Sequence, residues 1–284
     1  MQEASSMKWG IIGTGNMGEV ITHAFIQSNV IDEADLFITN RTLAKAQKLQ
    51  TQYPRIQVVE STFDVIQKVD TIFLCVKPRD MVNVLHEAKT ILKDHQLLVS
   101  ITSGISVDQL EQLVNCRVAR MVPSITNRAL GGVSLITFGS RMNKKEQDTF
   151  IHQCSQFSEP FVIDENIIRI SSDMVSCGPA FFSYLAERYI HDAQNQTSIS
   201  QEHATLLMEK MFIGFGKLLE QKHFTLDELI EKVCVTGGIT GVGIEALEER
   251  TDDLFQHLIQ ATHGKFYEEK NKVQTTINSH TPLF

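Results

Sequence analysis

Three glycines near the start of the chain have a spacing that suits phosphate binding. The segment Gly13-Thr-Gly15-Asn-Met-Gly18 follows an apolar run and precedes an amphipathic helical pattern. In that setting the first glycine permits a tight turn, the second lets a pyrophosphate approach the backbone, and the third allows close packing of helix on strand. A helix N-terminus then faces the phosphates. The alternative is a glycine-rich turn in an unrelated α/β protein; we favour the dinucleotide site because strand, loop and helix follow in order.

The residues after the second expected strand indicate which dinucleotide is bound. A site for NAD(H) would place Asp or Glu there to hold the ribose 2′-hydroxyl, but this chain has Asn40 and Arg41. A carboxylate would repel a 2′-phosphate, whereas Asn40 donates hydrogen bonds and Arg41 adds positive charge. The sequence therefore predicts NADP(H) as the cofactor. The alternative interpretation of Arg41 is a solvated cation at a helix start.

Two further loops are expected at the same edge, because ligands of open α/β sheets bind beyond the carboxyl ends of the strands. They are Cys75–Pro78 and Thr102–Gly104. Lys77 can face the cofactor there, although a lone lysine is more often a surface residue. The predicted cofactor-binding residues are Ile12, Gly13, Thr14, Gly15, Asn16, Met17, Gly18, Asn40, Arg41, Cys75, Val76, Lys77, Pro78, Thr102 and Ser103.

A second glycine-rich stretch, Thr236–Gly241, interrupts the helical patterns of the second half. Backbone N–H groups at such a turn form a seat for a carboxylate, and the hydroxyl of Thr240 adds a donor. A close helix–helix contact between small residues is the alternative. Cys177–Ala180 is predicted as another break before a helix. No Ser-His-Asp or H-E-x-x-H pattern and no metal site are visible, but hydride transfer to a protonated imine needs no strong general acid.

The secondary structure expected to position these residues changes near Asp164, from alternating strands and helices to helices alone. Before it, apolar runs alternate with helical spacing, which predicts a Rossmann doubly wound parallel sheet in residues 1–163. The expected strands are Lys8–Ile12, Leu36–Thr39, Thr71–Val76, Leu97–Ile101, Arg117–Val122, Ser134–Thr137 and Phe161–Ile163. Residues 164–284 are predicted to be all-helical, in segments 172–194, 200–221, 226–233, 241–249 and 252–271, with a frayed tail from Thr275 to Phe284.

Composition supports two globular domains and excludes several classes. With 284 residues, 42% of them hydrophobic, the chain is not disordered, collagen-like or membrane-spanning. Its net charge of -8 lies in the second half, and neither half has the basic stripe that nucleic acid needs. Five cysteines without a C-x-x-C pair indicate a reducing, cytoplasmic setting. The first six residues have no basic n-region, so we expect a loose leader and no signal peptide or membrane anchor.

The helical half is rich in apolar stripes, such as the one that runs from Leu206 to Leu219. These stripes offer more apolar surface than one small helical domain could easily cover. We therefore predict a homodimer, or a higher oligomer, through the helical domain. An intramolecular core is the alternative.

Taken together, the motifs resemble the pyrroline-5-carboxylate reductase family from Met7 to about Lys270. The matching pieces are Ile11–Gly18, Asn40-Arg41, Val76–Pro78, Ser100–Ile105, Arg120–Pro123, Gly178–Ala180 and Gly237-Gly238 with Thr240. The resemblance implies that NADPH reduces 1-pyrroline-5-carboxylate to L-proline, the last step of proline biosynthesis. It also implies a helical dimerisation domain, with active sites near its interface. Thr240 and Glu165 would be the catalytic residues, and the substrate carboxylate would be held by Thr236, Gly237, Gly238 and Ile239.

The substrate side departs from the family pattern. Val235 replaces a serine that donates to the substrate carboxylate, Thr236 replaces a proline, and Cys177 replaces a serine. The lost donor would cost about 1.5–3 kcal/mol of binding. This pattern is similar to the ComER-like branch associated with bacterial (late) competence loci. Two alternatives stay open: a catalytically weakened or non-enzymatic, nucleotide-sensing paralogue, and a reductase of a different small imino or hydroxy acid, which would be expected to carry a catalytic lysine on a helix.

Overall fold

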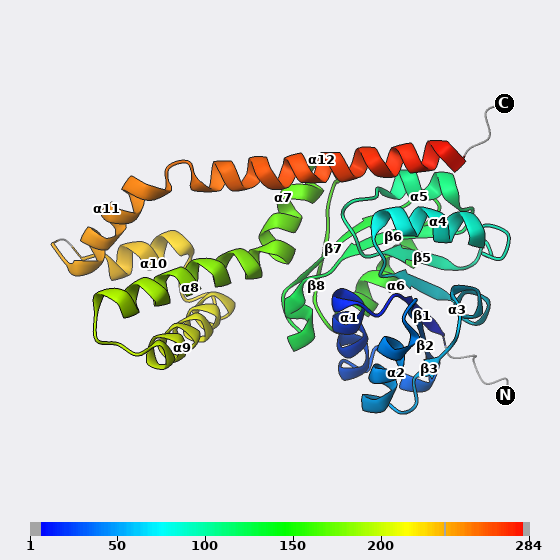
Figure 1. The fold of residues 1–284 in the computed structure, drawn as a ribbon, viewed down its shortest axis with the longest axis horizontal. Helices are drawn as coiled ribbons and strands as arrows, with labels where there is room; N and C mark the ends of the chain where they lie inside the picture. The colour runs from blue at the N-terminus through cyan, green and yellow to red at the C-terminus, as the bar shows by residue number, and fades with distance from the viewer. Residues whose placement is uncertain (1–6, 236, 281–284) are drawn as a thin grey trace. The chain divides into compact units, whose positions relative to one another are not determined.

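The computed structural model describes residues 7–235 and 237–280, which form two compact units (Figure 1). The first unit runs to Cys177 and resumes at Thr262, and the second is 178–261. These bounds differ from the expected division at 163/164. The reason is a small core cluster in which Ile168 and Phe266 pack with Ile163 and with residues of the sheet. That burial keeps the segment after Asp164, and the end of the chain, with the first unit.

The first unit is built on an eight-stranded sheet within the described residues. Its strand order is β3-β2-β1-β4-β5-β6-β7-β8, and the part from β3 to β6 has the order of a doubly wound dinucleotide-binding fold. The order reverses between β1 and β4. The strands are β1 (Trp9–Ile12), β2 (Leu36–Thr39), β3 (Gln57–Val58), β4 (Thr71–Leu74), β5 (Leu97–Ser100), β6 (Arg117–Val122), β7 (Val133–Phe138) and β8 (Glu159–Val162). Of these, the two-residue β3 is absent from the expected set.

Two strands run against the expected parallel sheet: β7 pairs antiparallel with β6, and β8 pairs parallel with β7, whereas β1 to β6 are all parallel to one another. The segment between β6 and β7 contains only a short 3-10 turn, η2 (Ile125–Ala129). A parallel crossover needs a dozen or more residues, usually with a helix. The connection is too short for that, so the chain turns back.

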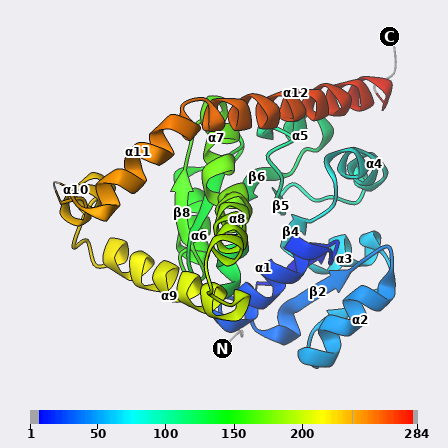
Figure 2. The ribbon, with the colours of Figure 1, turned by 60° about the vertical axis from the view of Figure 1, so that its left-hand side comes forward.

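Helices cover both faces of the sheet (Figure 2). One core cluster joins the sheet to α1 (Asn16–Gln27), α2 (Leu43–Gln52) and α6 (Lys144–Cys154). The other joins it to α3 (Thr62–Lys68), α4 (Pro78–Ala88), α5 (Val107–Leu113) and the end of α12 (Leu254–His280). Strands buried on both faces by helices are what the apolar runs of the sequence predict.

The predicted fraying of Thr275–Phe284 is wrong for residues 275–280, which continue α12. Val273 is completely buried and Ile277 is 3% exposed, both in the second core cluster. The side chain of Gln274, between them, accepts a hydrogen bond from Gln109 of α5 at 2.8 Å. These contacts, four residues apart along one face, hold the last turns of the helix on the first unit. Residues 281–284 lie outside the described range.

A run of helical turns leads out of the first unit without the break that Cys177–Ala180 predicts. It consists of η3 (Glu165–Ile167), α7 (Ile168–Ser172) and a π-helical turn, η4 (Asp173–Cys177), which continues into α8 (Gly178–Gln196). Pro179 is the second residue of α8 and has no N–H to donate to the preceding turn, so it interrupts the helical hydrogen bonds where η4 continues into α8. The local irregularity of the sequence therefore produces a wide π turn instead of a loop.

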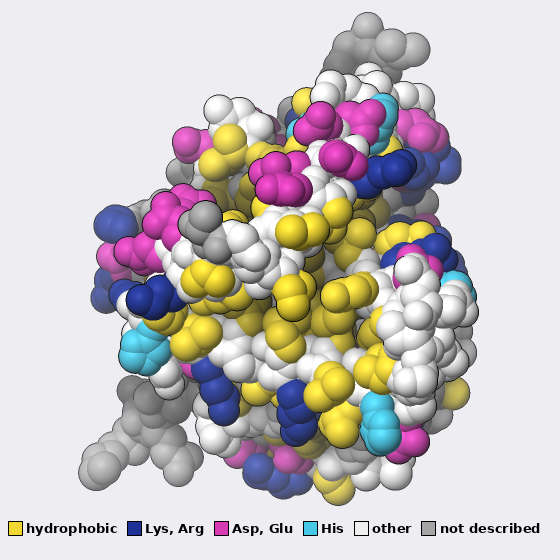
Figure 3. Space-filling view, turned by 90° about the vertical axis from the view of Figure 1, so that its left-hand side faces the viewer, with side chains coloured by type: hydrophobic (Ala, Val, Ile, Leu, Met, Phe, Trp, Pro, Cys, Tyr) yellow, Lys and Arg dark blue, Asp and Glu magenta, His cyan; other side chains and the backbone are white. Residues whose placement is uncertain are grey.

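The second unit consists of α8, α9 (Gln201–Glu220), α10 (Leu226–Val233), α11 (Ile239–Thr251) and the start of α12. Only Gly178 is buried in α8 and only Ala204 in α9, and none of the residues of α10 and α11 is buried. Many large apolar side chains are exposed instead, as Figure 3 shows. They include Phe182, Tyr184, Tyr189, Leu206, Leu207, Met211, Ile213, Leu226, Ile230, Val233, Val242 and Leu247. A unit of this kind lacks a core of its own and presents a surface suited to association.

Candidate dinucleotide site and glycine turn

The loop between β1 and α1 needs its three glycines for three different reasons. Gly13 has φ +101°, and a Cβ there would lie 2.7 Å from the Cys75 carbonyl oxygen. A Cβ on Gly18 would lie 2.0 Å from the Gly13 carbonyl oxygen. At Gly15 no described atom lies within 4 Å of an added Cβ. Two glycines thus shape the loop, and the third leaves its outer side open to a ligand.

Helix α1 begins at this open point with its first N–H groups uncapped by a side chain. Its N-cap is Gly15, which carries no side chain, and Glu19 N–H already closes the first turn onto the Gly15 carbonyl at 2.8 Å. The N–H groups of Asn16 and its neighbours in the first turn have no earlier turn to bond to. The side chain of Met17 packs on the first core cluster, so only its backbone is available to a ligand.

Asn40 fixes the glycine loop to the end of β2. Its Oδ1 accepts the N–H of Thr14 at 3.0 Å, and its Nδ2 donates to the Thr42 carbonyl at 3.0 Å. These bonds leave one amide N–H for a phosphate. The main role of Asn40 is therefore to hold the loop, and the positive charge expected beside a 2′-phosphate comes from Arg41.

A pocket of about 740 Å³ lies at the carboxyl ends of β1, β2 and β4. It brings together most of the predicted cofactor-binding residues, since its lining includes Ile12, Gly13, Gly15, Asn40, Arg41, Cys75, Val76 and Lys77. Asn16 and Thr14 line a smaller adjoining hollow with Gly15. The volume is ample for a nucleotide. Burial raises the pKa of the Cys75 thiol, so this group stays neutral beside a pyrophosphate.

The cations of this pocket are available to an anion. Arg41, Lys45 and Lys77 form no ion pair with an acidic residue of the described chain. A second pocket of about 640 Å³ shares Arg41 and Lys77 and adds Pro78 and Arg79. Arg79 and Lys45 are not among the cofactor-binding residues predicted from the sequence. The signal was present, because Arg79 follows the Lys77-Pro78 loop directly and Lys45 lies one helical turn after Arg41.

The loop after β5 packs beside the loop after β4. A Cβ on Gly104 would lie 3.0 Å from Cγ of Pro78, and the Gly104 N–H donates to the Thr102 hydroxyl at 3.2 Å. Thr102 and Ser103 are both half-buried, and neither lines the two pockets above. They lie on the β4–β5 side of the point where the strand order reverses, which is the second half of a doubly wound site.

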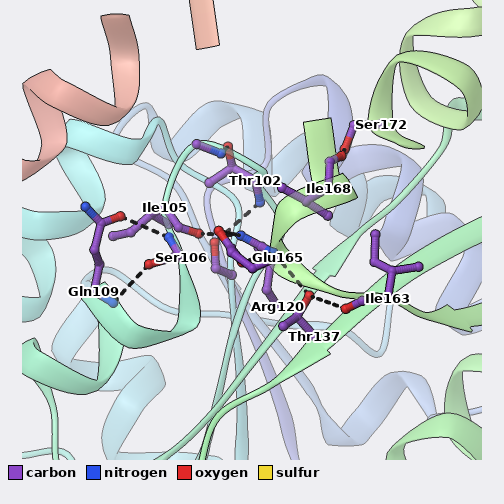
Figure 4. Close-up of polar contacts among 12 residues, drawn as sticks. Thr102, Ile105, Ser106, Gln109, Arg120, Thr137, Ile163, Glu165, Ile168 and Ser172 are labelled. Atoms are coloured by element: carbon purple, nitrogen blue, oxygen red, sulfur yellow. Dashed lines mark hydrogen bonds and ion pairs between the residues drawn. The ribbon is translucent and has the colours of Figure 1, made fainter. Parts of the chain in front are cut away.

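Glu165 lies beside this loop and is held by a buried arginine (Figure 4). Arg120 of β6 is fully buried, and its two Nη atoms donate to the Glu165 carboxylate at 2.5 and 3.3 Å. The same guanidinium donates to the Ile105 carbonyl and to the Thr137 hydroxyl, both at 3.1 Å. Lys270 Nζ is 3.9 Å from the carboxylate. Glu165 is therefore a salt-bridged carboxylate, a geometry suited to holding neighbouring groups in place.

The glycine turn predicted to bind the substrate carboxylate, Thr236–Gly241, belongs to the second unit. Gly237 has φ +72°, and the Gly238 N–H donates to the Val235 carbonyl at 2.9 Å, so the chain turns tightly before α11. Gly238 is the N-cap of α11, and Thr240 is exposed in its first turn. Ile239 is 93% exposed, and Thr236 lies outside the described residues. The N-cap therefore has no side chain that could bind the first-turn N–H groups, and these groups can donate hydrogen bonds to an anion.

No group of three or more His, Cys, Asp or Glu side chains in the described residues could hold a metal ion. None of the helices in the described part of the chain is long and apolar enough to cross a membrane. The cysteines at 75, 116, 154, 177 and 234 are free thiols. The cytoplasmic location stays a prediction from the sequence.

Two family models match the chain. One, described as pyrroline-5-carboxylate reductase dimerisation, matches residues 165–269. The other, described as NADP oxidoreductase coenzyme F420-dependent, matches residues 8–104. The first covers most of the helical region and the second covers the strands and loops that line the pocket.

Known proteins match along most of the chain. ComE operon protein 4 of Bacillus subtilis is 46% identical over 268 residues, which cover 94% of this chain and 98% of that protein. Pyrroline-5-carboxylate reductase 3 of the same organism is 27% identical, with coverage of 90% and 94%. A Plasmodium falciparum pyrroline carboxylate reductase solved with NADP bound has a TM-score of 0.79 at 20% identity, covering 96% of this chain and 99% of that one. The Streptococcus pyogenes 1-pyrroline-5-carboxylate reductase has a TM-score of 0.78 at 21% identity, with coverage of 93% and 98%.

Proposed function

Because the chain belongs to the pyrroline-5-carboxylate reductase family, in a divergent branch with ComE operon protein 4, we propose that it reduces 1-pyrroline-5-carboxylate to L-proline with NADPH. The observation that carries this proposal is the pocket at the ends of β1, β2 and β4, with its glycine loop and unpaired cations. Its donors and its open backbone fit a dinucleotide phosphate.

The bound dinucleotide would supply a hydride to the imine carbon, and the imine nitrogen would carry the proton. The residues of this chain bind and orient. The α1 N-terminus at Gly15 receives the pyrophosphate, and the neutral Cys75 thiol lies beside it. The loop with Thr102 and Ser103 holds the nicotinamide end. In this proposal no side chain forms a covalent bond to the substrate, so catalysis rests on proximity and on the electrostatics of the site.

The preference for NADPH over NADH rests on Arg41. Arg41 stands where a carboxylate would hold a ribose 2′-hydroxyl, and it forms no ion pair with an acidic group of the described chain. A guanidinium binds a phosphate by charge-assisted, bidentate hydrogen bonds. Lys77 and Arg79 line the second pocket together with Arg41, where these three cations face two carboxylates, those of Asp80 and Glu269.

The substrate carboxylate is assigned to the glycine turn before α11, with Gly237, Gly238, Ile239 and the Thr240 hydroxyl. Thr236 is part of this assignment on sequence grounds alone. Val235 is 65% exposed beside the turn and offers no donor. We therefore expect weaker substrate binding than a serine at this position would give, by about one to two orders of magnitude.

A homodimer, or a higher oligomer, is part of the proposal. The second unit exposes most of its large apolar side chains, and its helices bury few residues of their own. A second copy of the chain is the occupant that a pyrroline-5-carboxylate reductase dimerisation family model favours. Light scattering of the purified protein at low micromolar concentration should give a mass of at least two chains; a single-chain mass would refute this part.

The deciding experiment measures NADPH binding by fluorescence and NADPH oxidation with 1-pyrroline-5-carboxylate over a wide substrate range. We expect binding and turnover with a high KM, and Val235→Ser should lower that KM about tenfold or more. Tight NADPH binding without turnover, unchanged in Val235→Ser, would favour the non-enzymatic paralogue instead. Turnover only with other cyclic imines or small hydroxy acids would favour a reductase with a different substrate.

A further inference from the structure

Two arginines from different elements, Arg120 fully buried and Arg169 partly buried, hold the loop after β5. Arg120 of β6 donates to the Ile105 carbonyl at 3.1 Å. Arg169 of α7 donates from Nη1 to the Ser103 hydroxyl oxygen at 3.2 Å. Glu165 binds the first arginine and Asp173 binds the second, so each guanidinium is neutralised and oriented by a carboxylate.

The Arg169–Asp173 pair joins a partly buried arginine to a buried aspartate and is held at several points. The two side chains are 15% and 7% exposed, and Nη2 of Arg169 donates to Oδ1 of Asp173 at 2.7 Å. The Thr262 hydroxyl donates to the other carboxylate oxygen at 2.8 Å. Arg169 also lies 5.7 Å from the centre of the Phe266 ring. A planar guanidinium fixed on these sides has one orientation, so the N–H that it points at Ser103 is fixed as well.

The residues of this network lie at the two points where the chain leaves the first unit and returns to it. Asp173 opens the π-helical turn that ends at Cys177, the last residue of the first unit, and Arg169 Nη2 also donates to the Cys177 thiol at 3.4 Å. Thr262 is the first residue after the chain returns. A π turn inserted in a helix is frequently associated with a functional site. Here it places Asp173 where it binds Arg169 and Thr262 together.

The loop that Arg169 contacts belongs to the nicotinamide half of the proposed site. A dinucleotide crosses the point where the strand order reverses, between β1 and β4. Arg41, after β2, fixes the adenosine half on the β1–β2 side. The other half must then extend over the ends of β4 and β5, where Ser103 lies. Because the Ser103 oxygen accepts from Arg169, its own O–H is directed elsewhere and is left to donate to a ligand.

We propose that Arg169 is a positioning residue for the nicotinamide half of the dinucleotide. Oriented by Asp173, it fixes the Ser103 hydroxyl so that this group donates to the nicotinamide end of the cofactor. The inference rests on the proposed dinucleotide site and assigns a role within it to Arg169, Asp173 and Ser103. It predicts that the network affects binding of the whole dinucleotide and leaves binding of its adenosine half unchanged.

The test compares two probes on the full-length protein. NADPH is titrated by fluorescence, and adenosine 2′,5′-bisphosphate, which lacks the nicotinamide half, by calorimetry. In Arg169→Gln and in Ser103→Ala the Kd for NADPH should rise about tenfold, which is roughly 1.4 kcal/mol. The Kd for adenosine 2′,5′-bisphosphate should change less than twofold. The double variant should bind NADPH no more weakly than Arg169→Gln alone, since the arginine acts through the serine.

Arg117→Gln is the matched control. Arg117 is the first residue of β6, at the end of the strand away from the proposed site, and it forms an ion pair with Glu146. This variant should leave both Kd values unchanged. Equal weakening of both probes in Arg169→Gln, or additive effects in the double variant, would show a merely structural role and overturn the inference. If Arg169→Gln does not fold, the NADPH Kd of Ser103→Ala tests the inference by itself, and an unchanged Kd in that variant overturns the inference. Wild-type protein that binds neither probe would refute the proposed cofactor site itself.

Discussion

Replacing Gly15 and Gly18 by alanine, one at a time, separates ligand binding from folding within a single loop. At Gly18 the new Cβ would lie 2.0 Å from the Gly13 carbonyl oxygen, whereas real Cβ atoms essentially never approach closer than 3.0 Å. Backbone must move to relieve this contact, which costs about 1–3 kcal/mol or more. For a chain of this size we expect Tm to fall by about 2–4 °C for each kcal/mol.

At Gly15 the same methyl group meets no described atom within 4 Å, and the backbone angles of φ −77° and ψ −166° suit any residue. The reduced entropy of the unfolded chain, about 0.4–1 kcal/mol, offsets the weaker N-cap of alanine. Stability should therefore stay within about 1 kcal/mol of the wild type. The methyl group points into the space that the pyrophosphate needs, so the NADPH Kd should rise at least tenfold, by an order-of-magnitude estimate.

Thermal unfolding and NADPH fluorescence titration of both variants test this contrast. Gly18→Ala should lose stability, and Gly15→Ala should lose binding while keeping its Tm. A Gly15→Ala protein that binds NADPH like the wild type would refute the placement of the pyrophosphate. A Gly18→Ala protein with an unchanged Tm would refute the packing argument for the third glycine.

Three further predictions use single side chains. Arg41→Ala should raise the NADPH Kd by about tenfold to a hundredfold and leave the NADH Kd nearly unchanged, because only NADPH has the 2′-phosphate; equal effects in paired titrations would contradict this. Glu165→Gln should lower Tm, with a loss of roughly 1–3 kcal/mol, since Arg120 is fully buried while Glu165 is 36% exposed; an unchanged melting curve would contradict a structural role for the pair. Burial, with a smaller effect of Arg128, lowers the pKa of His23 below its ordinary 6.5. As the pH falls through 6.5, His23 takes up a proton in the unfolded chain but resists protonation in the native chain, so the free energy of unfolding should fall. This loss should be smaller in His23→Gln. Denaturation curves measured at pH 8 and at pH 5.5 test this, and an equal loss of unfolding free energy in the two proteins would refute it.

Local patterns were sufficient where the backbone itself sets the constraint. The glycine spacing predicts the loop between β1 and α1, and the structure confirms why each glycine is needed: a left-handed φ at Gly13, an open side at Gly15, and a close approach at Gly18. Apolar runs predict strands for the same reason, because a parallel sheet buried on both faces excludes polar side chains. The helical segments of the second half were confirmed, and residues 226–233 match α10, but α12 continues to His280, nine residues beyond its predicted end.

Long-range partners could not be inferred from those patterns. Asn40 looked like a phosphate ligand, but its Oδ1 holds the N–H of Thr14, 26 residues away, and its Nδ2 donates to the Thr42 carbonyl. Glu165 was assigned to catalysis by resemblance, and its carboxylate is bound by Arg120, 45 residues away. Arg169 is 66 residues from Ser103 and had no local signature at all. Such pairs depend on which elements the fold brings side by side.

The sequence by itself determined the kind of protein: a glycine loop for a dinucleotide, cations instead of a carboxylate after β2, and a helical half with more apolar surface than it can bury. These properties reside in single residues and short periods, so they are visible before folding. The tertiary structure decided the rest. It reversed β7 and β8 relative to the other strands, returned α12 to the first unit through Val273 and Ile277, and brought Arg120 and Arg169 to one loop. The reason is that buried charges must find partners and apolar helix faces must find cover, and only the folded chain determines which ones are within reach.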